Sequence, residues 1–514
     1  ILALSASKYP LKPAIIFGQK KINFGELNLF TDRLAHGLKE LGVAKSDRVA
    51  LLLDNSPHFI ISYFAIVKLG AVVVPVNHMF KYEEASHIIS DSKALVLITS
   101  SPYLEMAYKI KENFINLKHI LTTSKEERNI PSIYEWIYDP SRIFSGEEIK
   151  KDDTAVILYT SGTTGRPKGA MLSHGNLISN ILASKEVIRA TKKDSVICIL
   201  PLFHSFAATV CMLLPFYAGA SVVLMKSARP FKRTIRAMLK NKVRVFVGIP
   251  SLYNILNEVK LPRIIDSFLM RFLLPIRLCI SGAAALPVPT WKKFQKRFRV
   301  PLLEGYGLTE ASPVVSLNPC KGINRGGSVG LPLRGVDVAI AGKNGEVLGV
   351  GEVGEILVRG PNVMKGYLND VNSTNEAIKD GWLYTGDLGK KDSDGYIYIV
   401  GRKKDMVNVR GLNVYPREIE DLLCQHPGVR EAAVIGVYDY HKGETPKGFV
   451  VLKEGSSLTE RELILYLRKY LANYKVPRSI EFKQSLPKNT TGKILKRVLI
   501  EEEHSKMESP RAKA

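Results

Sequence analysis

Cysteine is scarce in this 514-residue chain, and no two cysteines are spaced as a pair. The cysteines are Cys198, Cys211, Cys279, Cys320 and Cys424. Five single, scattered cysteines are too few for a disulfide scaffold in a chain of this length, and none has the C-x-x-C or other spacing of a metal site. The sequence therefore predicts a reducing, cytoplasmic environment.

Acidic residues are also in short supply. The chain has 49 Asp and Glu against 73 Lys and Arg, a net charge of +24. Local basic clusters at 226–244 and 292–299 do not interleave aromatic rings with cations, as a surface that stacks nucleic-acid bases would. We therefore expect no nucleic acid as a partner. The charge suits anionic substrates and peripheral contact with anionic lipid headgroups.

One long segment, residues 207–225, lacks charge altogether and is long enough to span a bilayer. Pro215 and Gly219 divide it into a short helix and a β-branched strand. We therefore predict a buried helix–turn–strand unit in place of a membrane span.

The distribution of apolar runs predicts an α/β protein of two domains. Strand-like and helix-like segments alternate from residue 47 to residue 98, which is typical of layered α/β domains with largely parallel sheets. Short strands punctuated by glycine predict a β-rich subdomain at about 326–400. Beyond it, predicted helices at 416–424 and 459–471 and a strand at 432–437 form a small α+β unit. We expect an N-terminal domain over 1–401 and a mobile C-terminal domain over 402–514, with a frayed charged tail from Glu501.

The densest chemical signal is Tyr159–Gly169, with the sequence YTSGTTGRPKG, which follows the apolar run 155–158. Its glycines let backbone N–H groups face a ligand, its hydroxyls donate hydrogen bonds, and Arg166 and Lys168 add positive charge. It is not a Walker A loop, because Pro167 precedes the lysine and Gly169 follows it. The segment predicts a phosphate-binding loop of another family.

This loop and five further blocks in the same order resemble the adenylate-forming superfamily of acyl-CoA synthetases, luciferases and peptide-synthetase adenylation domains. The further blocks are 303–310 (LEGYGLTE), 354–360 (GEILVRG), 382–388 (WLYTGDL), 401–405 (GRKKD) and 487–493 (PKNTTGK). The resemblance covers nearly the whole chain and is greatest to bacterial long-chain fatty acid–CoA ligases.

The resemblance implies a site for ATP and Mg²⁺. In such a site Tyr306 would stack on adenine, Thr309 would bond the α-phosphate, and Glu310 would hold Mg²⁺ through oxygen. Asp387 would accept hydrogen bonds from the ribose, with Arg402 beside it. The residues expected to wrap the β- and γ-phosphates are Thr160, Ser161, Gly162, Thr163, Thr164, Gly165 and Lys168. Those expected to complete the nucleotide site are Gly282, Ala283 and Gly307.

The C-terminal blocks imply a catalytic lysine and a hinge. Lys493 would reach the substrate carboxylate and the α-phosphate during adenylation. Lys404 would be the pivot of a rotating domain. Arg410 and Gly411 would then line the tunnel for the CoA thiol.

The acyl pocket is expected near His204, which resembles the gate at the carboxylate end of that pocket. Glu258 is the only carboxylate between Ser195 and Asp266, so the ammonium of an amino acid would lack a partner. An uncharged tunnel suits a fatty acyl chain, since each buried CH₂ contributes about 0.8 kcal/mol. The other expected pocket residues are Phe203, Val247, Gly248 and Gly282. Ala207 and Ala285 depart from the family pattern and leave the chain length open.

The predicted function is that of a fatty acid–CoA ligase. A fatty acid and ATP would give acyl-AMP and pyrophosphate, and CoA would then take the acyl group and release AMP. The alternatives are an aryl or short-chain acid CoA ligase, a ligase that loads a carrier protein, and a basic nucleotide- or nucleic-acid-binding protein without catalysis. The oligomeric state stays open, a homodimer included.

Overall fold

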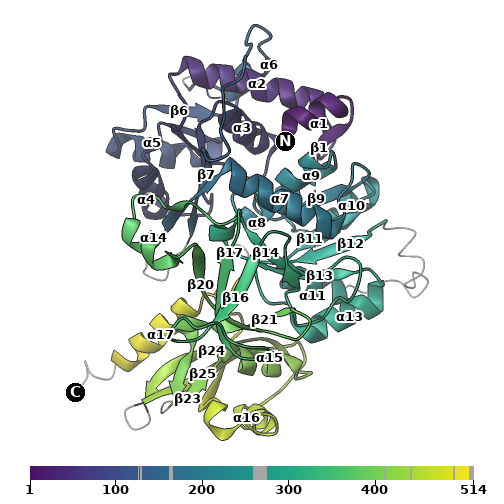
Figure 1. Ribbon diagram of the computed structural model, residues 1–514, viewed down its shortest axis with the longest axis vertical. Coiled ribbons are helices and arrows are strands. Elements are labelled where there is room, and N and C mark those ends of the chain that lie inside the picture. Colours follow the sequence, from purple (N-terminus) through teal and green to yellow (C-terminus); the bar gives the residue numbers. More distant parts are fainter. Residues whose placement is uncertain are drawn as a thin grey trace.

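The computed structural model describes residues 1–125, 127, 130–160, 166–258, 275–409, 412–439, 443–489 and 492–508. The N-terminal elements form one end of the molecule and the C-terminal unit the other (Figure 1). Helices and sheets are mixed throughout, which confirms the predicted α/β class.

The first sheet has seven strands within the described part of the chain, in the order β18-β8-β7-β4-β3-β5-β6. Strands β4 and β5 are buried along their whole length, as strands covered on both faces are. Pairing is parallel from β7 to β6 and antiparallel between β7 and β8 and between β8 and β18. The strands are β3 (Arg48–Leu52), β4 (Val72–Pro75), β5 (Val96–Thr99), β6 (His119–Thr122), β7 (Thr154–Thr160), β8 (Lys168–Ser173) and β18 (Gly366–Tyr367). The helices of this part are α2 (Phe24–Glu40), α3 (Pro57–Lys68), α4 (Tyr82–Ser92), α5 (Leu104–Asn113) and α6 (Ile133–Tyr138).

A second, nine-stranded sheet has the order β15-β14-β13-β12-β11-β9-β10-β1-β2 over the described residues. It shares one large hydrophobic core with most of the first sheet. Its strands are β1 (Pro13–Phe17), β2 (Lys20–Asn23), β9 (Ser195–Cys198), β10 (Ser221–Leu224), β11 (Val245–Gly248), β12 (Leu278–Ser281), β13 (Leu302–Gly307), β14 (Val314–Leu317) and β15 (Leu331–Pro332). Its helices are α1 (Leu2–Lys8), α7 (His174–Ile188), α8 (Ser205–Ala208), α9 (Leu214–Tyr217), α10 (Phe231–Lys240), α11 (Pro250–Glu258) and α13 (Val288–Phe298).

The uncharged segment 207–225 forms the buried helix–turn–strand unit that the sequence predicts. It passes through α8, a π-helical turn at Thr209–Leu213, α9 and then β10. None of the helices in the described ranges is long and apolar enough to cross a membrane.

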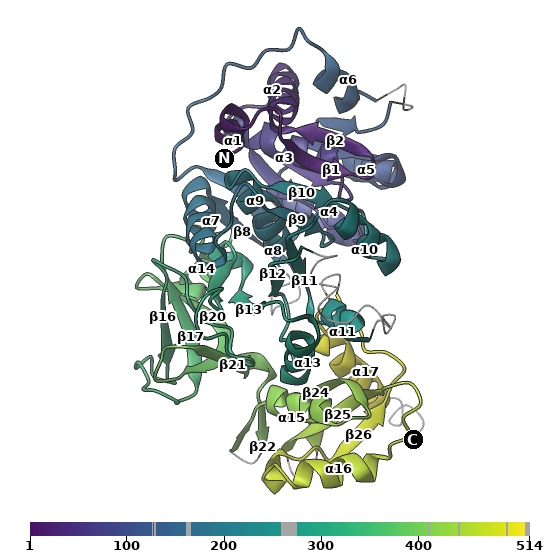
Figure 2. The same cartoon turned by 90° about the vertical axis from the view of Figure 1, so that its right-hand side faces the viewer.

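The β-rich subdomain and the small C-terminal unit follow in the predicted order. The first is an antiparallel sheet of β16 (Asp337–Ala341), β17 (Gly354–Arg359), β19 (Ile378–Lys379), β20 (Trp382–Lys391) and β21 (Ile397–Arg402), with α14 (Val371–Ala377) beside it. The second contains β22 (Val407–Val409), β23 (Leu412–Val414), β24 (Val429–Asp439), β25 (Gly443–Leu452), β26 (Ser479–Phe482), α15 (Pro416–Gln425), α16 (Glu460–Arg468) and α17 (Lys496–Glu508). Figure 2 shows the C-terminal unit next to α11 and α13 of the N-terminal part.

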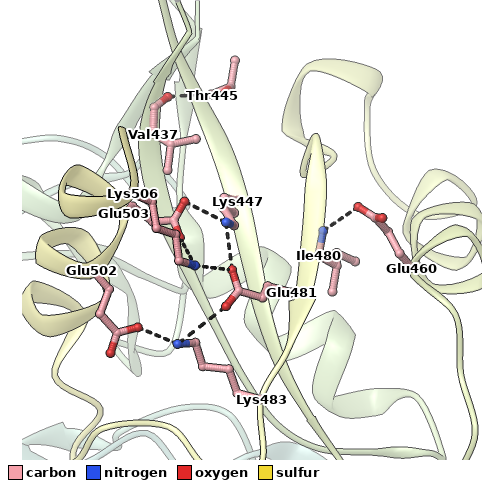
Figure 3. Close-up of polar contacts among 10 residues, drawn as sticks. All are labelled: Val437, Thr445, Lys447, Glu460, Ile480, Glu481, Lys483, Glu502, Glu503 and Lys506. Carbon is pink, nitrogen blue, oxygen red and sulfur yellow. Dashed lines mark hydrogen bonds and ion pairs between the residues drawn. The ribbon is translucent and has the colours of Figure 1, made fainter. Parts of the chain in front are cut away.

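The expectation of a frayed tail from Glu501 is wrong for residues 501–508, which continue helix α17. The cause is a network of ion pairs between this helix and strands β25 and β26 (Figure 3). Lys447 lies 2.7 Å from the buried Glu503 and 3.0 Å from Glu481. Lys506 lies 2.9 Å from Glu481. The acidic run is thus neutralised by lysines and docked on the sheet.

Candidate active site

Strands β13, β20 and β21 bring a tyrosine, a carboxylate and a guanidinium together. The Tyr306 hydroxyl donates a hydrogen bond of 2.7 Å to Oδ2 of Asp387, and Nε of Arg402 lies 3.0 Å from Oδ1. Asp387 is only 6% exposed, so these partners compensate for its lost hydration. Burial opposes the charge of Arg402, but the carboxylates of Asp387 and Asp405 raise its pKa. Burial, and then Asp387, raises the pKa of Tyr306 well above its usual value, so the phenol stays a donor.

Glu310 lies where β13, β7 and β18 meet. Its Oε1 accepts a hydrogen bond of 2.9 Å from the Tyr367 hydroxyl and a longer one, 3.5 Å, from Oγ1 of Thr160. The Met364 N–H also donates to the Glu310 carbonyl at 2.8 Å. The segment 364–367 thus fixes both the backbone and the side chain of Glu310.

A single carboxylate is what a magnesium–nucleotide site requires, because the phosphates supply the remaining oxygens. Elsewhere in the ranges that the structure describes, no three His, Cys, Asp or Glu side chains are grouped to hold a metal ion by themselves. Glu310, which lies beside Thr160 at the start of the segment 159–169, is a single carboxylate of the kind that would hold such an ion together with phosphate oxygens.

The phosphate loop connects β7 and β8, whose last and first residues, Thr160 and Lys168, are paired in register. The expected phosphate ligands Ser161, Gly162, Thr163, Thr164 and Gly165 lie outside the described residues. The Lys168 ammonium donates to Oγ of Ser373, lies 3.5 Å from Asp370, and is 5.6 Å from the centre of the Tyr367 ring. These contacts hold one cation beside the loop.

His204 caps the N-terminus of helix α8, and its Nδ1 accepts a hydrogen bond of 3.3 Å from the Phe206 N–H. The neighbouring Ser205 hydroxyl lies 3.3 Å from Oγ1 of Thr309. Burial, and then the Lys493 ammonium, lowers the pKa of His204 to about 4. The imidazole is therefore neutral at physiological pH, and because Nδ1 accepts, Nε2 carries the proton and can donate one hydrogen bond.

Gly282 and Ala283 follow β12 in a crowded turn. A methyl group on Gly282 would lie 2.8 Å from the Phe206 ring, and the Gly282 N–H donates to the Gly248 carbonyl at 3.4 Å. Ala283 has a φ of +67°, a left-handed conformation that non-glycine residues adopt at a cost and often at functional sites. Gly307 also has no room for a side chain, since a methyl group there would lie 2.2 Å from the Pro313 carbonyl oxygen.

The expected acyl-pocket residues come from three segments of the chain, and their role stays a prediction. Val247 is fully buried in β11, next to Gly248 at the end of that strand. The Phe203 ring packs edge-on against His78, with ring centres 5.5 Å apart. Phe203 thus also packs against the loop that follows β4.

Lys493 reaches the N-terminal part from its loop on the C-terminal unit. Its N–H donates to Oδ1 of Asn489 at 2.8 Å, and a methyl group on Gly492 would lie 2.7 Å from Cδ1 of Ile249. Burial lowers the pKa of Lys493 to about 8, and the charge of Arg402 adds to the decrease, against Asp387 and Asp405. The Lys493 ammonium therefore interacts electrostatically with the Asp387–Arg402 pair and with His204.

The expected hinge lies on the short 3-10 turn Lys403–Asp405 between the two units. Burial lowers the pKa of Lys404, and the Lys403 ammonium lies 2.8 Å from Glu355 of β17. Arg410 and Gly411, expected to line the thiol tunnel, lie outside the described residues.

Sequence reasoning missed Glu304, a carboxylate beneath the interface of the two units. It is 2% exposed, its Oε1 accepts a hydrogen bond of 2.8 Å from the Leu286 N–H, and Oε2 has no hydrogen-bond partner. Burial, with a smaller contribution from Asp421 of α15, raises its pKa to about 7, although Arg417 of the same helix opposes the shift. Tyr367 was missed as well, since nothing in Gly366-Tyr367 signals a partner for Glu310.

Comparisons with known proteins agree with this geometry. Residues 2–368 match the AMP-binding enzyme family, and residues 418–493 match the AMP-binding enzyme C-terminal domain. A long-chain-fatty-acid–CoA ligase of Bacillus subtilis is 37% identical over 98% of this chain and 94% of its own. ATP-bound MatB from Rhodopseudomonas palustris superposes with a TM-score of 0.89 at 33% identity, covering 98% of each chain. The anthranilate CoA ligase AuaEII, in complex with anthranoyl-AMP, gives 0.89 at 30%, covering 98% of this chain and 96% of its own. By its fold and these matches, the chain belongs to the AMP-binding enzyme family.

Proposed function

We propose that this enzyme is an ATP-dependent fatty acid–CoA ligase. In the first step a fatty acid carboxylate attacks the α-phosphate of ATP, giving acyl-AMP and pyrophosphate. In the second, the CoA thiol attacks the acyl carbonyl, giving acyl-CoA and AMP. The observation that supports this chemistry is the half-buried Lys493 on a loop of the C-terminal unit, whose ammonium interacts electrostatically with Asp387, Arg402 and His204.

The roles in adenylation follow from the chemistry of each group. Two anions must meet, so the cations Lys493 and Lys168 would stabilise negative charge on the carboxylate and the phosphates. Thr309 would donate to the α-phosphate, and Asp387 would accept from the ribose beneath the Tyr306 ring. Mg²⁺, when bound through Glu310 and the phosphates, would neutralise charge on the leaving pyrophosphate. The remaining phosphate contacts would come from Thr160 and residues 161–165.

The second step would need a different arrangement, because pantetheine must reach the acyl-adenylate where Lys493 now lies. We infer a domain boundary after residue 401, with the β-rich subdomain at about 326–400 inside the first domain. Residues 402–514 would rotate about Lys404 and bring Arg410 and Gly411 to the thiol tunnel. The support is that Lys404 lies on the short turn that joins β21 to the C-terminal unit.

The fatty acid is proposed from two observations. The B. subtilis relative is named for a long-chain fatty acid, and the segment from 195 to 258 contains one carboxylate, at its far end. The similarity to AuaEII, an anthranilate CoA ligase, keeps an aryl acid as the second candidate.

The deciding experiment is ATP–pyrophosphate exchange with unbranched acids from acetate to stearate, with benzoate and amino acids as competing substrates. We expect the highest kcat/KM with a medium or long unbranched acid, and dependence of thioester formation on CoA. Higher turnover of benzoate or an amino acid would overturn the fatty-acid assignment. Exchange without thioester formation would overturn CoA as the acceptor.

We also propose a cytoplasmic enzyme without a nucleic-acid partner that makes peripheral contact with anionic membrane. The excess of positive charge supports the contact. The oligomeric state is open, with a homodimer to be tested by light scattering.

A further inference from the structure

One surface of the N-terminal part is basic and free of acidic residues. Residues 226–244 contain eight cations and no Asp or Glu. Helix α10 lies in the middle of this segment, at the periphery of the molecule in both views (Figures 1 and 2). One cation, Arg244, pairs with Asp194 at 3.3 Å.

The cations of α10 form one exposed face of the helix. Thr234 and Met238 are buried and fix which side of α10 packs on the protein. On the opposite side lie Lys232, Arg236 and Lys240, spaced four residues apart, with Arg233 beside them; all four are exposed. Like charges at this spacing repel one another and destabilise a helix.

Nothing within the described residues relieves this repulsion. The ion pairs of the described chain include none with Lys232, Arg233, Arg236 or Lys240. An anionic partner from outside the chain would remove the repulsion.

A groove of about 240 Å³ beside α10 adds an apolar component. Arg233, Arg236 and Lys240 line one side of it, and apolar side chains from the ends of β1 and β10 line the other, including Ile16, Val223 and Met225. Leu239, 41% exposed, stands among the cations on the outer face. Gly18 also lines the groove, and the exposed Lys20 and Lys21 follow it in the chain.

We propose that α10, together with this groove and the turn at 18–21, docks on the surface of an anionic phospholipid bilayer. The cations would lie against lipid phosphates, and Leu239 and the apolar side of the groove would contact the glycerol and upper acyl region. A nucleic acid would fit less well, because the four cations have no aromatic ring among them on which bases could stack. The inference rests on the proposed function in one respect: a substrate dissolved in the membrane would make this docking useful.

The test is sedimentation of the full chain with vesicles, without ATP or acid. One set of vesicles contains phosphatidylcholine with about one-third phosphatidylglycerol, and the other phosphatidylcholine alone. We expect the wild-type enzyme to bind the anionic vesicles and to be released by salt. The partition coefficient should decrease at least about tenfold in the triple variant Lys232→Glu, Arg236→Glu, Lys240→Glu. The triple variant with Gln at the same positions should have a partition coefficient between those of the wild type and the Glu variant.

The matched control reverses three exposed lysines of α13, Lys292→Glu, Lys293→Glu and Lys296→Glu, which changes the net charge by the same amount. The control should keep most of its binding. Failure of the wild type to bind, equal binding to both vesicles, or equal loss in the control would overturn the proposal. The proposal would also be overturned if the enzyme bound poly-uridine RNA through α10 and did not bind vesicles.

A ligase assay with a short water-soluble acid, without vesicles, separates this test from the proposed function. The α10 variants should retain wild-type turnover there, because their side chains lie outside the proposed site. Loss of turnover in that assay would mean that α10 serves the fold or the chemistry, and it would overturn a docking role.

Discussion

The hydroxyl of Tyr306 donates to one carboxylate oxygen of Asp387, while the other oxygen pairs with Arg402. The carboxylate proposed for the ribose is therefore aimed by two groups before any nucleotide arrives. Such pre-organisation lowers the cost of ordering the site when ATP binds.

Tyr306→Phe should raise the KM for ATP about tenfold, because a hydrogen bond to a charged group is worth about 1.5–3 kcal/mol. The ring, and with it stacking on adenine, would remain. Tyr306→Leu should cost more, and steady-state kinetics in ATP would measure both. An unchanged KM in Tyr306→Phe would mean that Arg402 alone positions Asp387.

Tyr367→Phe should raise the Mg²⁺ concentration needed for half-maximal adenylation several-fold, since Glu310 would lose its 2.9 Å hydrogen bond. Glu310→Gln should have a larger effect, because Mg²⁺ prefers a charged oxygen ligand. The control is Tyr398→Phe, which removes a 3.0 Å bond to Asp392 in the β-rich sheet and should leave the requirement unchanged. If both tyrosine variants behave alike, Tyr367 does not position the metal ligand.

The rate of adenylation should fall above about pH 8. Burial lowers the pKa of Lys493 to about 8, so its ammonium is present below that pH and is lost as pH rises through it. The pH dependence of kcat/KM for pyrophosphate exchange reports pKa values of the free enzyme. It should therefore show this decrease above about pH 8. Lys493→Arg, which stays charged, should be slower but should lack this decrease. If the decrease at high pH persists in this variant, it arises from the titration of another group.

The two half-reactions should separate by mutation. Lys493→Ala should lower adenylation at least about a hundredfold, the scale of losing one preorganised donor, yet still convert supplied acyl-AMP and CoA to thioester. Lys404→Pro, which fixes φ at the hinge, should retain adenylation and lose thioester formation, and Gly411→Leu should do the same. Single-turnover assays of each step would measure this. Equal losses in both steps for all three variants would exclude domain rotation.

Glu304→Gln should raise thermal stability at about pH 8 but not at about pH 5. The pKa of Glu304 is raised to about 7 in the folded enzyme, so folding retains a proton between the ordinary carboxyl range and pH 7. Stability therefore decreases as pH rises through that window and stays reduced above it, by roughly 3 kcal/mol at most at 1.36 kcal/mol per pKa unit. Glutamine removes the cost of ionisation. Scanning calorimetry at both pH values would detect the difference, and an equal shift at both would contradict it.

Much of the fold could be predicted because its signals are local. The alternation of apolar runs indicated the parallel sheets. Gly219 correctly marked the turn before β10, whereas Pro215 lies inside the helical stretch that ends at Tyr217. Strands were expected on both sides of the glycine-rich segment 161–165, and the structure has β7 before it and β8 after it.

What the sequence could not provide were pairings between distant segments. The tail after Glu501 carries a dense acidic run that predicts fraying, but Lys447 of β25 neutralises it from far away in the chain. The contact of Tyr367 with Glu310 depends on how β18 joins the first sheet, and no local pattern encodes that register. The high pKa of Glu304 arises only because the fold buries it.

Strand β18 covers the edge of β8 only late in the synthesis of the enzyme. This strand of two residues pairs with Met171 and Ala170 of β8, which the ribosome synthesises far earlier. Until residue 367 has emerged, β8 presents an open edge to which other nascent chains can add. The same residue brings the hydroxyl that holds Glu310. A nascent or truncated chain that ends before β18 would therefore keep an exposed edge on β8 and would lack the hydroxyl that holds Glu310.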